Sequence, residues 1–229
     1  MKALHPWNVN VEEAIEIQKR FRNQIILRRT FSELRTVGGA DIAYSKNGDL
    51  LYGAIAVLAF PEMEVLSIVT APGRISFPYI PGLLSFREGP ILLRVFRRLK
   101  IKPDLIIFDG QGIAHPRRFG LASHLGLWLD LPSIGCAKTS LLEEVRLPDP
   151  GKGNFDLLRR GKEEVGAVLR TRENVKPVFV SPGHRIDLMS SIEVILACCP
   201  KFRIPEPLRI AHQIAEAKIR NPNIEIRNE

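Results

Sequence analysis

The chain has 229 residues, of which 45% are hydrophobic and 25% charged, and this composition excludes general disorder and fibrous repeats. The length is sufficient for one substantial core, and we predict a single domain over residues 1–229. Basic side chains outnumber acidic ones by 33 to 25, and the resulting formal charge of +8 makes a polyanion such as nucleic acid a reasonable partner.

The sequence contains no signal for export or for insertion into a membrane. Its three cysteines, Cys136, Cys198 and Cys199, have neither the spacing of a disulfide framework nor that of a zinc site, so we expect a reducing, cytoplasmic setting. Residues 1–20 carry charges throughout and lack an apolar export segment. No stretch reaches the roughly 18 apolar residues that a membrane-spanning helix needs.

The first part of the chain predicts a helix, a group of strands and a second helix. Residues 10–29 place apolar side chains at helical spacing among charged ones. Three strand-like runs follow, separated by turn-forming residues at 47–49 and at Pro61-Glu62, and they favour an antiparallel meander. These runs lie near 36–45, 51–60 and 64–71. After a loop over 72–82, residues 83–100 are helical, and Pro90 either kinks this helix or marks where its regular part begins.

The second part of the chain predicts a crossover and a closing group of elements. An apolar strand at 104–108, a helix near 117–129 and a strand at 133–137 form a βαβ unit, which should make its two strands parallel. The remaining elements are a hairpin from 165–171 and 177–181 and helices near 187–199 and 206–220. We therefore predict an α/β fold: a mixed sheet, with a three-strand antiparallel meander plus parallel strands, flanked by helices on both faces.

Three carboxylates lie in segments that should bury apolar side chains, where an unpaired charge is costly. Asp41 is on the first predicted strand, and Asp109 ends the apolar run at 105–108. The strands that carry these two residues are natural neighbours, so we expect Asp41 and Asp109 side by side. Glu88 reaches over from the second helix, where it shares one face with apolar residues at spacings of three and four. Together the three acids favour a site.

Such a group of acids suits the hydrolysis of a phosphodiester. Mg²⁺ is a hard cation that prefers carboxylate and water oxygens, and two ions about 3.5–4 Å apart can clamp the attacking and leaving oxygens. Each acid also has a structural alternative. Asp109 can cap a turn, Asp41 can sit at a bulge beside Gly38-Gly39, and Glu88 can pair with a neighbouring arginine, Arg87 or Arg94.

Six segments together resemble the endonuclease V family, in the expected order and across most of the chain. They are VGGADIAYS (37–45), PYIPGLLSFREGP (78–90), PDLIIFDGQGIAHPRRFGLASHLG (103–126), LPSIGCAKTSL (131–141), SPGHRIDL (181–188) and RIPEPLRIAH (203–212). The resemblance implies an RNase H-like core and a Mg²⁺-dependent DNA repair endonuclease, with Mn²⁺ as a substitute metal. It further implies recognition of deoxyinosine and hydrolysis of the second phosphodiester bond 3′ to the lesion, leaving 3′-OH and 5′-phosphate ends.

The resemblance also implies roles for particular residues. Asp41 and Asp109 match the metal-binding aspartates of the family, and Glu88 matches the acid of its FRE motif. Lys138 matches a lysine that should hold the scissile phosphate, although by itself it reads as a solvated lysine after a strand. His212 matches a position near the site that holds His in some members and Asp in others, but a lone histidine on a helix is more often structural or exposed.

A second set of residues is implied to bind the nucleic acid. The segment Pro78-Tyr79-Ile80-Pro81 resembles the wedge with which the family opens the base stack; without the resemblance it reads as a loop packed on the core. Three glycines are candidates for a base pocket because the main chain can approach a base there, or they are ordinary turn residues. These are Gly82, Gly110 and Gly120, of which Gly82 stands where many relatives carry serine. Three further candidates for contact with DNA are His115, Arg117 and Arg118, the arginines being otherwise solvated.

Two other functions remain open from the sequence. A ribonuclease on the same core would act on inosine in RNA, and these residues do not reveal whether the site uses a 2′-hydroxyl. The chain could instead be a non-catalytic nucleic-acid-binding module in which the acids are structural. The intact set of acids argues against this last reading.

Overall fold

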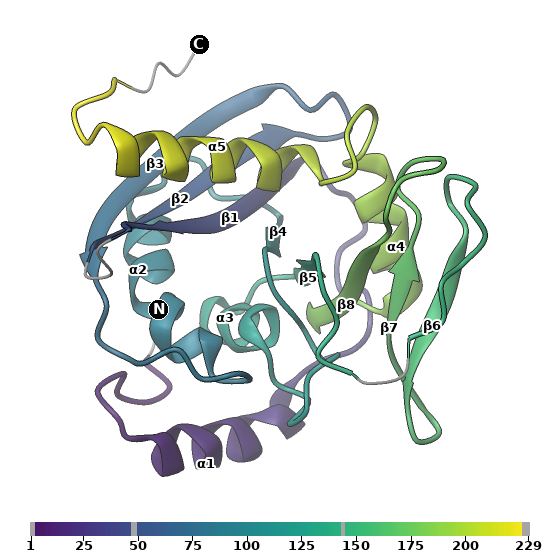
Figure 1. Cartoon of the computed structure of the whole chain (residues 1–229), viewed down its shortest axis with the longest axis horizontal. Helices are drawn as coiled ribbons and strands as arrows, with labels where there is room; N and C mark the ends of the chain where they lie inside the picture. The colour runs from purple at the N-terminus through teal and green to yellow at the C-terminus, as the bar shows by residue number, and fades with distance from the viewer. Residues whose placement is uncertain (1–2, 47–49, 143–144, 226–229) are drawn as a thin grey trace.

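An eight-stranded mixed sheet runs through the computed structural model, which describes residues 3–46, 50–142 and 145–225, with strand order β3-β2-β1-β4-β5-β8-β7-β6 (Figure 1). The strands are β1 (Thr36–Tyr44), β2 (Leu50–Ala59), β3 (Val65–Arg74), β4 (Leu105–Phe108), β5 (Ser133–Ala137), β6 (Phe155–Arg160), β7 (Glu163–Leu169) and β8 (Val178–His184). The helices are α1 (Val11–Phe21), α2 (Leu84–Arg98), α3 (Leu121–Leu129), α4 (Leu188–Ala197) and α5 (Glu206–Arg220), with one 3₁₀ turn at Arg22–Gln24. Among the described helices, none has the length and apolar character to span a bilayer.

The predicted topology is confirmed. Strands β1, β2 and β3 form the antiparallel meander, and β1, β4 and β5 are parallel neighbours. Strand β8 then pairs antiparallel with β5, and β7 pairs antiparallel with β8 as the predicted hairpin. The turn predicted at 47–49 lies outside the described residues. The centre of the sheet is therefore its parallel part.

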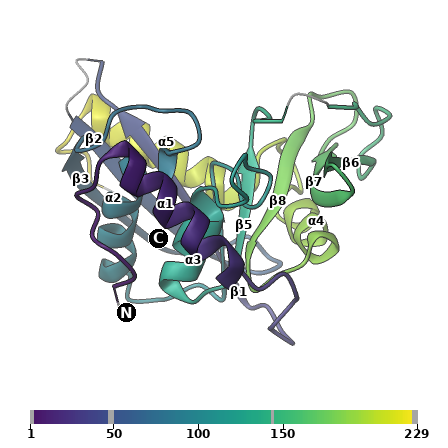
Figure 2. The same cartoon turned by 90° about the horizontal axis from the view of Figure 1, so that it is seen from below.

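Helices cover both faces of the sheet, as expected (Figures 1 and 2). Because side chains alternate along a strand, β1 sends Ile42 toward α2 and α3, and sends Ala43 toward α4 and α5. Helix α1 lies outside this layer and buries Ala14 against Phe77 and Phe86, beside the start of α2. Figure 2 shows α1 crossing over α2 and α3.

Two helix boundaries and one strand differ clearly from the sequence prediction. The first helix ends near Gln24 rather than residue 29, because the chain turns away and the Ile26 amide donates to His184 Nδ1 at 3.3 Å. Helix α3 begins at Leu121 rather than 117, since Gly120 is its extended N-cap residue. Strand β6 was not predicted. Its sequence, FDLLRR, ends in two arginines, and charged side chains of this kind are typical of an edge strand.

Helix α5 approaches β1 most closely at Gly39. A Cβ atom at this position would lie 2.1 Å from the carbonyl carbon of Pro207 and 2.4 Å from the nitrogen of Leu208. Both of these are backbone atoms at the start of α5, and they cannot rotate away. Only glycine lets the helix lie this close to the strand, two residues before Asp41.

We expect Gly39→Ala to lower the free energy of unfolding by about 2–3 kcal/mol, because the added methyl group must push α5 off the sheet. Gly53→Ala is a matched control on β2, where a Cβ would meet only side chains, Ile91 at 3.2 Å and Val95 at 3.3 Å. Its cost should stay within about 1 kcal/mol. Urea unfolding followed by circular dichroism measures both, and equal costs would contradict the close approach.

Candidate active site

Two of the predicted acids lie side by side at the carboxyl ends of parallel strands. Asp109 directly follows β4, and its amide donates to the Ala40 carbonyl of β1 at 3.3 Å, so the next residue of β1, Asp41, is its neighbour. Lys138 directly follows β5, the parallel neighbour of β4 on the other side. The carboxyl ends of parallel strands form a crevice in which α/β proteins commonly bind ligands.

Glu88 enters the same region from α2 and is buried, with 8% of its surface exposed. Burial raises the pKa of Glu88 to about 8; a hydrogen bond from the Tyr44 hydroxyl to Oε1, at 2.7 Å, opposes this, and the charges of Asp41 and Asp109 reinforce it. The guanidinium of Arg87 donates instead to the Phe77 carbonyl. The partner of Glu88 is thus a tyrosine rather than the arginine that the structural alternative required.

The two aspartates each have a basic side chain as a partner. Lys138 Nζ lies 2.5 Å from Asp109 Oδ2, and His212 Nδ1 of α5 lies 2.8 Å from Asp41 Oδ2. Burial raises the pKa of Asp109, Asp41 adds to the rise, and Lys138 opposes it. The hydrogen bond to Asp41 raises the pKa of His212 despite its partial burial. The structure therefore gathers all five predicted catalytic residues, the fifth being Glu88.

The donor chemistry of this group fits a hard divalent cation. In the part of the chain that the structure describes, no three or more His, Cys, Asp and Glu side chains are arranged, as they stand, to hold a metal ion. Lys138 and His212 occupy one oxygen each of Asp109 and Asp41. Burial raises the pKa of both Glu88 and Asp109, and the negative charge of Asp41 adds to each rise. A cation bound by carboxylates would relieve this repulsion.

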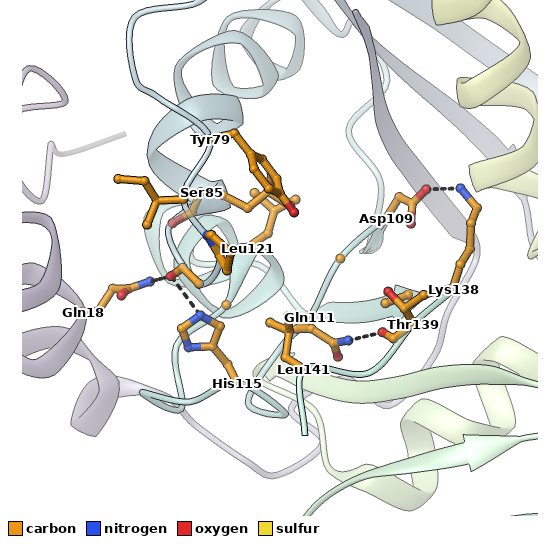
Figure 3. A pocket seen from close by; sticks show the side chains of 17 residues that line it. Gln18, Tyr79, Ser85, Asp109, Gln111, His115, Leu121, Lys138, Thr139 and Leu141 are labelled. Atoms are coloured by element: carbon orange, nitrogen blue, oxygen red, sulfur yellow. Dashed lines mark hydrogen bonds and ion pairs between the residues drawn. The ribbon is translucent and has the colours of Figure 1, made fainter. Parts of the chain in front are cut away.

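A cavity of about 280 Å³ opens beside the acids (Figure 3). Asp109 and Lys138 are at one side of it, and the wedge loop, Pro78-Tyr79-Ile80-Pro81, contributes Tyr79, Ile80 and Pro81. Tyr79 has 70% of its surface exposed. All three glycines predicted for a base pocket, Gly82, Gly110 and Gly120, line this cavity. The volume is just below the range of about 300–1,000 Å³ usual for small-molecule pockets, and so suits a ligand of modest size.

The glycines differ in why they are needed. Gly82 has φ +81°, a conformation that favours glycine. At Gly120 a Cβ would lie 2.4 Å from the backbone oxygen of Gln111, so the close packing of two main-chain segments requires it. At Gly110 a Cβ would meet only side chains, Leu121 at 3.3 Å and Leu84 at 3.8 Å. Packing alone does not demand glycine at 110, and its part in a base pocket stays a prediction.

The residues predicted to contact DNA around 115–118 are tied to the protein itself. The Gly82 carbonyl accepts hydrogen bonds from His115 Nε2 at 2.9 Å and from Arg117 at 2.7 Å. Burial lowers the pKa of His115 to about 4, so this ring is neutral at pH 7 and donates from Nε2. Arg118 forms an ion pair with Glu163. Contact of these three residues with DNA stays a prediction, and His115 and Arg117 lie at the foot of the wedge loop.

Sequence reasoning missed three polar residues of the site. Tyr44, which holds Glu88, gives no pattern beyond its place three residues after Asp41. Gln18 donates to the Gly82 carbonyl at 2.9 Å and accepts a hydrogen bond from Arg117 Nε. Its helical spacing from Ala14 and Phe21, on the buried face of α1, was the available signal in the sequence. Gln111 lines the cavity and donates to the Thr139 carbonyl at 2.8 Å.

The sheet order and the acids at its parallel centre define an RNase H-like α/β protein with the site of a nuclease. The family model described as Endonuclease V matches residues 19–213. Endonuclease V of Dictyoglomus turgidum is 53% identical over 88% of this chain and 87% of its own, and that of Methanothrix thermoacetophila is 50% identical over 96% of each. The chain belongs to the endonuclease V family.

Solved structures of relatives have the same fold. The crystal structure of endonuclease V from Streptomyces avermitilis superposes with a TM-score of 0.89 at 42% identity, over 95% of this chain and 96% of that one. Endonuclease V of Ciona intestinalis, 28% identical over 94% of this chain and 100% of its own, gives a TM-score of 0.83. That protein was crystallised in complex with a 23mer DNA containing an inosine followed by a ribo-adenosine.

We expect Glu88→Gln to stabilise the metal-free protein at alkaline pH. Between pH 4.5, the ordinary pKa of this carboxyl, and about 8, its folded pKa, only the folded state keeps the proton, so the wild type loses stability as pH rises. The glutamine stays neutral and can still accept from Tyr44. In EDTA at pH 8.5 the melting temperature of the variant should exceed that of the wild type by about 2–4 °C, which corresponds to a gain of about 1 kcal/mol in the free energy of unfolding. The difference should shrink at pH 5; a constant difference would contradict a buried charge.

Proposed function

We propose that this chain is a Mg²⁺-dependent endonuclease that recognises deoxyinosine in DNA and hydrolyses the second phosphodiester bond 3′ to the lesion. The observation that carries the proposal is the placement of Asp109 and Lys138 at one side of a cavity whose other side is the wedge loop. A base held in the cavity and a phosphate held at the acids then belong to one strand. The inosine-containing DNA bound by the Ciona relative supports the choice of base.

The residues divide the chemistry among them. Bound Mg²⁺ would orient a water molecule, stabilise charge on the phosphorus oxygens and neutralise the leaving alkoxide. Asp41 on β1 and Asp109 directly after β4 are neighbours and are the residues that would hold it, and Mn²⁺ would suit the same oxygens. Glu88, held by Tyr44, either binds a second ion or orients the water. The ammonium of Lys138 has three donors, and it would exchange its contact with Asp109 for a phosphate oxygen of the substrate.

Tyr79 is the residue that would enter the base stack. It is exposed on a loop stiffened by two prolines, and the Gly82 carbonyl beneath that loop is fixed by three donors, from Gln18, His115 and Arg117. A rigid foot allows the aromatic ring to fill the gap left by the rotated base without folding back. Opening costs least where pairing is already weak, as at an inosine.

Cleavage of a duplex with one deoxyinosine tests the proposal directly. With Mg²⁺, the product should end one nucleotide beyond the lesion on its 3′ side, with 3′-OH and 5′-phosphate ends, as product sizing and end labelling will show. Asp109→Asn should lower the rate at least about 100-fold. Asp130→Asn, at an exposed aspartate paired with Arg185, is the control and should cut normally. Cleavage by Asp109→Asn at the wild-type rate would overturn the mechanism.

The same assay separates the competing functions. Matched DNA and RNA oligomers, each with one inosine, should show faster cutting of DNA, and the reverse result would make the protein a ribonuclease. A binding module would hold both oligomers equally in EDTA and in Mg²⁺ and would cut neither.

The cytoplasmic setting expected from the cysteines is part of this proposal, and the described residues contain them as three buried, unpaired thiols.

We expect Tyr79→Ala to lower the cleavage rate of a fully paired inosine duplex by about tenfold, because base–aromatic stacking contributes about 1–3 kcal/mol. On single-stranded inosine DNA, where no stack needs opening, the loss should be smaller. Tyr79→Phe keeps the ring and should cut both substrates normally. An equal loss on both substrates would show that Tyr79 does not act as a wedge.

A further inference from the structure

A second cleft, of about 510 Å³, lies between the end of β3 and helix α2 and shares no lining residue with the base cavity. Three arginines line it, Arg74 from β3 and Arg87 and Arg94 from α2, and none of its described lining residues is acidic. Arg74 and Arg94 are exposed, so a ligand can reach them from solvent. Three like charges around one cleft repel one another, and a bound anion would relieve this repulsion.

The three guanidinium groups have no carboxylate partner. Among the residues that the structure describes, none of these arginines forms an ion pair. Arg94 donates to the Pro72 carbonyl at 3.0 Å, and Arg87 donates to the Phe77 carbonyl at 3.0 Å. Each contact uses one of the five N–H donors of a guanidinium, so donors remain for a ligand. Their planar fork matches the oxygens of a phosphate group.

The backbone around the cleft is held in place. Leu51 and Ile91 line the cleft and are buried in the core that α2 forms with the sheet, and Figure 1 shows α2 against β2 and β3. The hydrogen bond from Arg94 to Pro72 joins the helix to β3. The cleft is thus a fixed feature of the fold.

One of the arginines connects the cleft with the acids. Arg87 Cζ lies 4.9 Å from the centre of the Tyr44 ring, and the Tyr44 hydroxyl donates to Glu88 Oε1 at 2.7 Å. The cleft therefore begins beside the acids, and a strand whose phosphate is held there can continue into it.

The order of residues along α2 gives that strand a direction. Ser85, in the first turn, lines the base cavity, and Glu88 follows one turn later. Arg94 lies about 9 Å beyond Glu88 along the helix axis, at 1.5 Å per residue. A strand that runs from the base in the cavity to the scissile phosphate at the acids has its 3′ part beyond them. At about 3.4 Å per nucleotide, this distance corresponds to about two or three nucleotides.

We propose that Arg74 and Arg94 bind backbone phosphates of the cleaved strand, two or three nucleotides beyond the scissile bond on its 3′ side. The inference rests on the proposed function and deepens it, because it gives the strand a path out of the active site. Contacts with phosphates add affinity without a preference for sequence. This suits an enzyme that recognises one altered base in any sequence.

The test removes charge from the protein and from the DNA in turn. Three duplexes carry one deoxyinosine: one has normal phosphates, one has neutral methylphosphonates at the second to fourth linkages 3′ of the scissile bond, and one has three methylphosphonates 5′ of the lesion. Dissociation constants are measured in EDTA by fluorescence anisotropy. We expect the double variant Arg74→Gln/Arg94→Gln to bind the normal duplex about tenfold more weakly than the wild type does, at about threefold for each contact. Its salt dependence should fall by about two phosphate contacts.

The loss should shrink to within about twofold on the duplex neutralised on the 3′ side, and should stay about tenfold on the duplex neutralised on the 5′ side. The matched control is Arg97→Gln/Arg98→Gln, which removes the same charge from exposed positions of α2 outside the cleft. This control should bind each duplex within about twofold of the wild type.

The outcomes are separable. If the cleft variant loses no more than the control, or if its loss persists on the duplex neutralised on the 3′ side, the inference is overturned while the proposed function stands. If the wild type binds inosine no better than an undamaged duplex and cuts neither, the proposed function and the inference both fail. Thermal melting verifies that the variants fold. If the double variant does not, Arg74→Gln alone replaces it, with an expected loss of about threefold that disappears on the duplex neutralised on the 3′ side.

Discussion

The parallel pairing of β1 with β4 is the interaction on which the rest of the molecule depends. It brings Asp41 next to Asp109, although 67 residues lie between them in the chain. Two neighbouring carboxylates repel each other, and burial strengthens the repulsion. Two neighbouring elements counter that repulsion: Lys138 follows β5, and α5 brings His212. Helix α2 adds a third acid, Glu88, which accepts a hydrogen bond from Tyr44 at the end of β1.

The same strands connect catalysis with recognition. The loop after β4 carries Asp109, Gly110 and Gln111 in succession, so the acid and the pocket wall share one short segment. Its packing leaves no room for adjustment, because a Cβ at Gly112 or Gly135 would overlap backbone atoms nearby. A rigid segment of this kind holds acids and pocket in constant relation, which suits an enzyme that must cut at a set distance from the base it recognises.

Much of this arrangement was accessible from sequence, for physical reasons. Long periodic segments such as 83–100 and 206–220 reveal helices, and the strand–helix–strand order at 104–137 predicts a parallel pair. The first strand of the meander is a natural neighbour of the first strand of that unit, and this expectation placed Asp41 beside Asp109. What escaped prediction depends on contacts between elements rather than on a pattern within one segment. The charged edge strand β6 is stabilised by β7 rather than by its own pattern. The partnership of Tyr44 with Glu88 and the hydrogen bond from Gln111 to Thr139 exist only after several elements have packed together.

The close contact of α5 with β1 at Gly39 has a consequence for the time at which the site comes into being. Asp41, Glu88, Asp109 and Lys138 all precede residue 140, whereas α5, which covers β1 and supplies His212, follows residue 205. During synthesis on the ribosome, the chain therefore carries every acid well before the sheet face behind Asp41 is covered. The pairing of Asp41 with His212, and the cover over this face of β1, are therefore completed only after the last helix has been made and has docked.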